Sequence, residues 1–335
     1  MTITQAGWTD ILTVLRQTHA IWSAGLSKSD YHEYIWRQLN HPWGLRNHKI
    51  FVMKVNGQVV SSCKLYTVEL TSRGRQFKLA GLGAIYTFAA HRHRGHACKM
   101  IEAMIEQCEN NQYDGMILYS DIDPLFYENL GFIPFGAADF TFHLPWHLAA
   151  EIEEEPVNYF ERHDIAAMAA IYGKWQRRQP FAFARGEDYF DYKFFKERFL
   201  ADHSFLAWPK LQIRFAYENA TPSAYALTET GGSVLRILEV VGSDSGRQQL
   251  WSAIFEEAYN RQIQKVRGWE SVAQDMSPGY KLSNVLPPEG KFQPPLPVVH
   301  YYQRDWGRPM ILPFDTALES WHNFFPCPIL ELDHL

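Results

Sequence analysis

The chain has 335 residues, of which 46% are hydrophobic, 15% aromatic and 21% charged, and this composition excludes an intrinsically disordered protein. The formal net charge of −5 disfavours a nucleic-acid-binding protein, because it gives no general attraction to phosphate backbones. Four scattered cysteines without a CxxC pair, and no stretch of 18 apolar residues, lead us to expect a cytoplasmic protein with reduced cysteines and no membrane span.

The first half of the chain predicts two helices, then a hairpin with Asn56-Gly57 as its turn, a third strand and an amphipathic helix. Asp30 and Glu33 are spaced as a capping box at the start of the second helix. A short buried strand after the amphipathic helix implies a parallel pair with a right-handed crossover. A short helix and a strand-like segment complete this half. The predicted ranges are 10–24, 30–39, 50–55, 59–70, 77–88, 95–110, 116–120, 124–130 and 132–144.

A similar order of elements begins again after an acidic segment at 151–156, which we interpret as a linker. Two helices, three strands and a helix are predicted over 165–176, 187–200, 211–216, 223–227, 234–241 and 246–263. We therefore expect two domains, 1–150 and 151–335, related by a diverged internal duplication. Ten of the 18 prolines lie at or after Pro278, so the tail is predicted to be extended and to wrap the surface, apart from a short helix near 316–323.

The segment from Gly83 to Ala97 has the features of an anion site, because a strand runs into a basic turn with Arg92, Arg94 and Gly95, and then into a helix. Free backbone N–H groups at a helix N-terminus bind phosphate oxygens, and a glycine lets a pyrophosphate approach the main chain. The two arginines can add charge-assisted hydrogen bonds. The histidines of this turn have no carboxylates beside them, so we expect no metal here.

The pattern Arg92-x-x-Gly95-x-Ala97 after a strand resembles the acyl-CoA signature of the GNAT (GCN5-related) N-acetyltransferases. The segment 125–132, Leu-Phe-Tyr-Glu-Asn-Leu-Gly-Phe, resembles a later signature of the same family. The resemblance covers roughly residues 10–144. It implies an α+β acyl-CoA N-acyltransferase fold, with a mixed central sheet flanked by helices, followed by a second, degenerate GNAT-like domain. It also implies acetyl-CoA as the co-substrate.

In this family, acyl-CoA lies in a gap where two central parallel strands splay apart. The resemblance implies that the pantetheine arm pairs with Tyr86, Thr87 and Phe88 at the end of the strand before the loop. The pyrophosphate contacts carry over to the loop and to the start of the helix, namely to Arg92, Arg94, Gly95, His96, Ala97 and Cys98.

Acetyl transfer to an amine requires the loss of a proton, since the neutral form of a lysine-like amine is scarce at pH 7 by about 3.4 pKa units. The leaving thiolate then benefits from a nearby acid. The resemblance implies that Tyr127 is this acid. Asp121, at the strand end beside the expected gap, is our candidate base. Asp123 and Glu33 are alternatives that are also explained as helix-capping residues.

The acceptor amine is expected to bind near the second helix and the end of the last central strand. The candidate side chains are Glu33, Tyr34, Trp36 and Ser120, and the aromatic residues among them are also explained as core. In some two-domain relatives a terminal carboxylate is thought to be the base, which makes Leu335 a further candidate.

The equivalent turn of the second half has Ser243 in place of the expected arginine, and Asp244 would repel phosphate, so we expect no CoA there. We expect an N-acetyltransferase that moves an acetyl group from acetyl-CoA to a primary amine of a small molecule, such as an amino acid or amino sugar, by direct attack in a ternary complex. The alternatives are a non-catalytic acyl-CoA-binding or sensing protein and a protein lysine acetyltransferase. Neither nucleic acid nor a membrane is expected as a partner.

Overall fold

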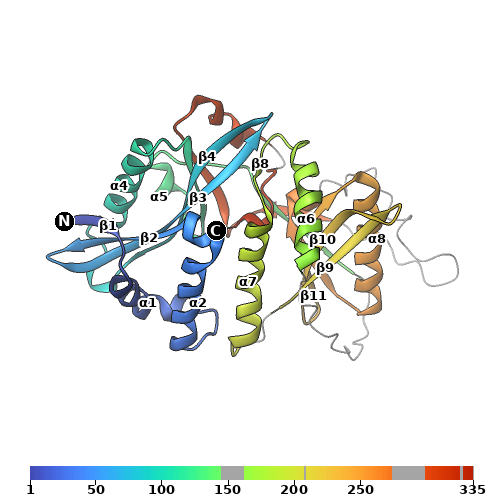
Figure 1. Ribbon diagram of the computed structural model, residues 1–335, viewed down its shortest axis with the longest axis horizontal. Coiled ribbons are helices and arrows are strands. Elements are labelled where there is room, and N and C mark those ends of the chain that lie inside the picture. The colour runs from blue at the N-terminus through green and yellow to red at the C-terminus, as the bar shows by residue number, and fades with distance from the viewer. Residues whose placement is uncertain (145–161, 207–208, 274–298, 325–326, 335) are drawn as a thin grey trace.

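The computed structural model describes the chain except residues 145–161, 207–208, 274–298, 325–326 and 335. In this part of the chain, two mixed sheets lie side by side, and helix α7 (Glu187–His203) runs between them (Figure 1). The expected α+β fold with a mixed central sheet and flanking helices, followed by a second similar unit, is confirmed. The predicted linker at 151–156 lies outside the described residues.

The first sheet contains the hairpin and the parallel pair that the sequence predicted. The Asn56-Gly57 turn has both residues at positive φ, as a tight hairpin turn requires. Strands β4 and β5 are parallel, and helix α4 connects them. In spatial order the strands are β1 (Thr2–Gln5), β2 (His48–Val55), β3 (Gln58–Ser72), β4 (Arg75–Thr87), β5 (Gly115–Ser120), β14 (Arg308–Pro313) and β6 (Ile133–Pro134), with β8 (Ala182–Phe183) on β3.

Helices cover both faces of this sheet (Figure 1). The apolar face of α4, with Met100, Ile101 and Met104, packs on one of them. The capping box predicted at Asp30 is wrong, because α2 begins one turn earlier, where Ser27 Oγ accepts a hydrogen bond from Asp30 N at 3.1 Å. The helices are α1 (Trp8–Trp22), α2 (Lys28–Asn40), α3 (Pro42–Asn47), α4 (His96–Asn110) and α5 (Leu125–Glu128).

The second sheet repeats the central arrangement of the first. Strand β11 runs parallel to β12 over Val234–Ile237, as β4 runs parallel to β5 over Leu79–Leu82. This match supports the internal duplication. The strands, in spatial order, are β13 (His300–Gln303), β7 (Ala138–His143), β12 (Lys265–Trp269), β11 (Val234–Gly242), β10 (Thr221–Gly231) and β9 (Lys210–Glu218). The helices of this half are α6 (Arg162–Gln176), α7, α8 (Asp244–Asn260) and α9 (Glu270–Ala273).

The two halves exchange strands. Strand β7 belongs to the first 150 residues but lies in the second sheet, beside β12. Strand β14 belongs to the rest of the chain but lies in the first sheet, beside β5. The predicted division at 150 therefore does not coincide with the division between the sheets. The predicted strand-like segment 132–144 is divided between the sheets, because β6 joins the first sheet and β7 joins the second.

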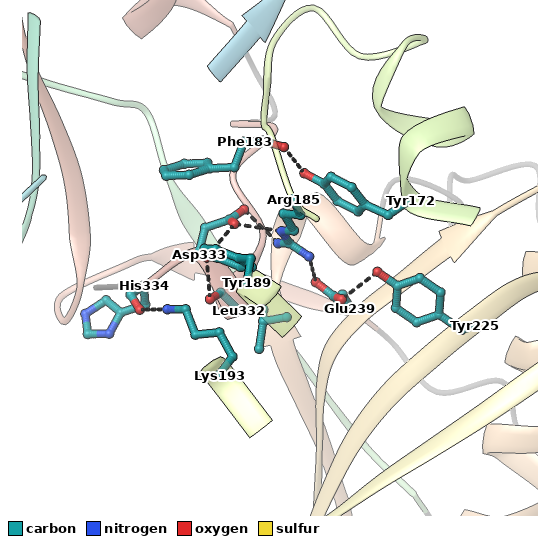
Figure 2. Close-up of polar contacts among 10 residues, drawn as sticks. All are labelled: Tyr172, Phe183, Arg185, Tyr189, Lys193, Tyr225, Glu239, Leu332, Asp333 and His334. Carbon is teal, nitrogen blue, oxygen red and sulfur yellow. Dashed lines mark hydrogen bonds and ion pairs between the residues drawn. The ribbon is translucent and has the colours of Figure 1, made fainter. Parts of the chain in front are cut away.

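The C-terminal segment is buried, so the prediction that the tail wraps the surface is wrong for its last described residues. Leu330, Leu332 and Asp333 are 1%, 8% and 1% exposed. The segment is fixed by a polar cluster around Arg185, whose guanidinium pairs with Asp333 and with Glu239 of β11, each at 2.8 Å (Figure 2). The helix expected near 316–323 is present as two short 3₁₀ turns, Thr316–Leu318 and Trp321–Asn323.

Candidate active site

The central parallel strands of the first sheet separate and open a cleft. The last residues paired between β4 and β5 are Leu82 and Leu118, and β4 continues to Thr87 paired only with β3. A bulge turns β4 at this point, because its register with β3 shifts and Ala84 adopts a φ of +47°. The cleft has a volume of about 680 Å³ and is lined by Ile85, Tyr86, Thr87, Arg92, His93, Gly95, His96, Ala97, Cys98, Ile122, Phe126 and Tyr127.

The N-terminus of α4 opens into this cleft. Gly95 is the N-cap residue with a φ of +74°, a left-handed conformation that favours glycine. A Cβ atom at Gly95 would meet no described atom within 4 Å, so the space in front of the helix is open. The first N–H groups of an α-helix have no partner within it, and those of His96, Ala97 and Cys98 therefore offer three donors to an anion.

Arg92 is held at the edge of the same opening. Its Nε donates a hydrogen bond to the Thr87 carbonyl at 3.2 Å, and its guanidinium lies 5.5 Å from the Tyr86 ring centroid. Arg94 is exposed and does not line the cleft. Desolvation and the nearby charge of His91 lower the pKa of His96, so its imidazole is neutral at pH 7. Positive charge in the cleft therefore comes from Arg92 and the helix dipole.

Tyr127 closes the inner side of the cleft. It is 8% exposed and its ring packs between Phe126 and Phe132, with centroids at 5.0 and 6.1 Å. Burial, with a smaller effect from the charge of Asp121, raises the pKa of Tyr127 to about 12. Its phenol therefore keeps its proton at neutral pH.

Asp121 follows the end of β5 and does not itself line the cleft. Its Oδ1 accepts a hydrogen bond from the Gly307 N–H at 3.0 Å. Burial raises the pKa of Asp121, and this hydrogen bond opposes the rise. The other candidate base, Asp123, accepts a hydrogen bond from Leu125 N at 3.0 Å, which agrees with a capping role at α5.

The expected acceptor residues are dispersed. Glu33 lies on the exposed side of α2 and pairs with Arg37, and Trp36 is 50% exposed. Tyr34 is buried against Phe199 of α7. Ser120, the remaining acceptor candidate, is buried, and its hydroxyl donates to the Ile122 carbonyl at 2.8 Å. Phe88, which was expected to contact the pantetheine arm, packs on the core beside β2 and does not line the cleft. Leu335 lies outside the described residues.

Sequence reasoning missed several residues that line the cleft. Ile122 and Phe126 flank the predicted Tyr127, and Phe126 belongs to the signature that was recognised. Ile85 follows the bulge, which no sequence pattern announced. His93 lies at a φ of +60° inside the basic turn, where the sequence indicated a solvated or phosphate-facing histidine rather than a metal ligand.

The corresponding helix start of the second half is closed. The hydroxyl groups of Ser243 and Ser245 donate to the Glu218 carboxylate, so an anion of the chain itself already lies at the start of α8. A Cβ atom at Gly246 would come within 2.7 Å of Ala224 and Ser223. This geometry agrees with the expectation that the second half binds no CoA.

The described residues contain no cluster of three or more histidine, cysteine, aspartate or glutamate side chains arranged to hold a metal. Among the helices of the same part of the chain, none combines the length and apolar character needed to cross a membrane.

Comparisons with known proteins point to one family. Residues 13–135 match the family model of the acetyltransferase (GNAT) domain. A comparison with curated protein sequences found no match. The fold is similar to that of a probable N-acyltransferase from Enterococcus faecalis V583, with a TM-score of 0.67 and 13% identity over 94% of this chain and 72% of that chain.

Two further solved structures share this fold. A GCN5-related N-acetyltransferase from Anabaena variabilis ATCC 29413 has a TM-score of 0.62 at 17% identity, over 92% of this chain and 72% of that chain. Eis1 from Mycobacterium abscessus has a TM-score of 0.55 at 11% identity, over 96% of this chain and 75% of that chain. The splayed strands, the open helix start and the family match agree, and they confirm the resemblance seen in the signature residues. Residues 13–135 are therefore a GNAT acetyltransferase domain, and the protein is an acyl-CoA-dependent N-acyltransferase.

Proposed function

We propose that the protein transfers an acetyl group from acetyl-CoA to the primary amine of a small molecule, by direct attack in a ternary complex. The observation that supports this proposal most strongly is the single cleft of about 680 Å³ that connects the open start of α4 with the Tyr127 side chain. An anion-binding end and a protonated acid thus share one cavity.

The residues present fit a CoA molecule. The N–H groups of His96, Ala97 and Cys98 and the guanidinium of Arg92 would bind the pyrophosphate. Beyond Leu82 the edge of β4 that faces β5 has no strand partner, so its peptide groups are available to the amides of the pantetheine arm. When bound, the co-substrate supplies the acyl group as a thioester and takes the electron pair away as a thiolate.

Two proton movements remain for the chain itself. The Asp121 carboxylate, directly or through water, would take the proton from the acceptor ammonium, and its raised pKa makes it a stronger base than an ordinary aspartate. The Tyr127 hydroxyl would give its proton to the departing sulfur. Its high pKa keeps that proton in place until negative charge develops on the sulfur.

A small acceptor is favoured by the position of α7. This helix belongs to the second half, yet Tyr192 and Phe199 of α7 contact Trp43 and Tyr34 of the first half, with ring centroids at 4.6 and 5.3 Å. Helix α7 therefore packs against α2 and α3, which cover the sheet face opposite α4 (Figure 1). A free amine can enter such an enclosed region more easily than a lysine on a folded protein.

The test is CoA release from acetyl-CoA with a panel of small amines and a lysine-containing peptide. We compare the wild type with Tyr127→Phe and use Tyr113→Phe as the control, because the Tyr113 hydroxyl bonds Thr67 at 2.7 Å and does not line the cleft. Loss of a general acid should lower kcat by about 10²- to 10⁴-fold. If Tyr127→Phe releases CoA with an amine as fast as Tyr113→Phe does, the proposed role of Tyr127 is contradicted. Binding of acetyl-CoA without amine-dependent release would favour a sensing protein.

A further inference from the structure

Two lysines face each other across the boundary between the two halves, on the sheet face opposite α4. One is Lys64 of β3, and the other is Lys196 of α7. Lysine is rarely placed in such a location, because desolvating an ammonium is costly unless a partner compensates it. The function of this pair is not explained by the cleft described above.

Lys64 lies beside the point where the central strands separate, although it does not line the cleft. Its register partner on β4 is Gly83, the first residue after the β4–β5 pairing ends. Its neighbours Cys63 and Leu65 pack on the α4 side, so the alternation of a strand directs Lys64 to the opposite face. The Lys64 side chain therefore extends from the point where the strands separate toward α7.

A chain of ring contacts connects Lys64 with Lys196. Tyr66, two residues after Lys64 on the same face, stacks on His48 with centroids 4.4 Å apart. His48 Nδ1 is 3.2 Å from the Tyr192 hydroxyl, and the Lys196 ammonium lies 5.9 Å from the Tyr192 ring centroid. Both lysines therefore adjoin the same group of rings, and both of their charges act on the buried His48.

Neither ammonium forms an ion pair or a hydrogen bond with a described residue. A third lysine nearby, Lys193, is different, because its Nζ donates to the His334 carbonyl at 2.7 Å. Glu197, next to Lys196, partly offsets the positive charge there. Burial, with a smaller effect from Lys196, lowers the pKa of Lys64 to about 7. An anion placed between the two lysines would compensate both of them.

We propose that Lys64 and Lys196 bind an anionic group of the acceptor, so that the acceptor is a small amine that also carries a carboxylate or a phosphate. This inference rests on the proposed function. Because the register partner of Lys64 is Gly83, where the β4–β5 pairing has ended, an anion held by the pair would lie near the separation of the two strands. The pair would thereby orient the acceptor and select against neutral amines.

The first test measures kcat/KM for matched pairs of acceptors. A carboxylate pair is β-alanine against β-alaninamide, and a phosphate pair is glucosamine 6-phosphate against glucosamine. In the wild type the anionic member of at least one pair should be preferred. Lys64→Gln and Lys196→Gln should each reduce this preference about tenfold to a hundredfold, because a hydrogen bond to a charged group is lost, while activity on the neutral member is kept. Lys49→Gln, an exposed lysine on β2, is the control. A wild-type preference for the neutral amines would overturn the proposal.

The second test does not need turnover. Inorganic phosphate and N-acetyl-β-alanine are titrated calorimetrically into the wild type at pH 7.5, in two buffers with different ionisation enthalpies. A bound anion should restore the charge of Lys64, so binding of at least one of the two probes should take up about half a proton or more. This uptake should be absent in Lys64→Gln. Absence of binding by both probes, or binding with equal uptake in the variant, would overturn the proposal.

The two tests separate the possible failures. If no amine releases CoA but an anion binds with proton uptake, the proposed function fails and the anion site stands.

Discussion

The polar cluster around Arg185 should be the most sensitive tertiary contact of the C-terminal segment. The side chains of Arg185 and Glu239 are fully buried, and that of Asp333 is 2% exposed. Arg185→Met removes the only cation that the described structure pairs with these two carboxylates, while Tyr225 and Tyr189 still donate to them at 2.8 and 3.2 Å (Figure 2). The change therefore leaves two uncompensated carboxylates in the interior.

Breaking one buried ion pair by removing one partner costs about 3–5 kcal/mol. We expect Arg185→Met to lower the free energy of unfolding by at least this amount, out of a total of about 5–15 kcal/mol for a typical protein. Burial already raises the pKa of Glu239 and Arg185 opposes this rise, so without the cation the pKa of Glu239 rises further above that of the unfolded chain. The folded variant then binds more protons than the unfolded chain, so its deficit should be smaller at pH 5.5 than at pH 8.

The assay is urea unfolding followed by circular dichroism at both pH values. Arg75→Met is the matched control, because Arg75 also pairs with an aspartate of the C-terminal region, Asp315, but is 53% exposed. An exposed pair contributes about 1 kcal/mol or less. If Arg185→Met loses no more stability than Arg75→Met, the cluster does not anchor the C-terminal segment and the reasoning is refuted.

Two further predictions concern the first half. Lys64→Met should be more stable than the wild type at pH 7, because it removes a desolvated charge. The pKa of Lys64 is lowered from 10.5 to about 7, so the unfolded wild type binds more protons between these values, and its stability should rise by about 2 kcal/mol from pH 7 to 9. In urea unfolding, the stability of Lys64→Met should not rise between pH 7 and 9. An equal rise in the variant and the wild type would contradict this prediction. Gly95→Ala should cost about 1 kcal/mol of unfolding free energy through its left-handed backbone, whereas an unchanged midpoint would show that the loop relaxes.

Much of the fold could be predicted because its signals are local. The Asn56-Gly57 turn and the apolar face of α4 follow directly from residue order. The strand exchange could not be predicted, because alternation marks β7 as a strand without indicating which sheet it joins. The prolines at both ends of Met310–Leu312 made β14 resemble an extended tail, although the strand lies between β5 and β6 in the first sheet.

The candidate site shows the same difference between local signals, which the sequence contains, and tertiary packing, which it does not reveal. The anion-binding loop is contiguous in sequence, so Arg92, Gly95 and the helix start could be recognised together. The lysine pair could not, because Lys64 and Lys196 converge from β3 and α7 through tertiary packing. Lys64 left only a weak signal, a single cation in the otherwise mainly apolar and hydroxylic segment 59–66.

The central claim is that the protein has one site for acetyl-CoA and that this site lies in the first half. Calorimetric titration of acetyl-CoA into the wild type, Arg92→Ala and Arg247→Ala tests it. The wild type and Arg247→Ala should bind one equivalent with equal affinity, and Arg92→Ala should bind at least about tenfold more weakly, because a charge-assisted hydrogen bond is lost. Absence of binding to the wild type, two equivalents per chain, or an Arg92→Ala variant that binds like the wild type would contradict the assignment of the cleft.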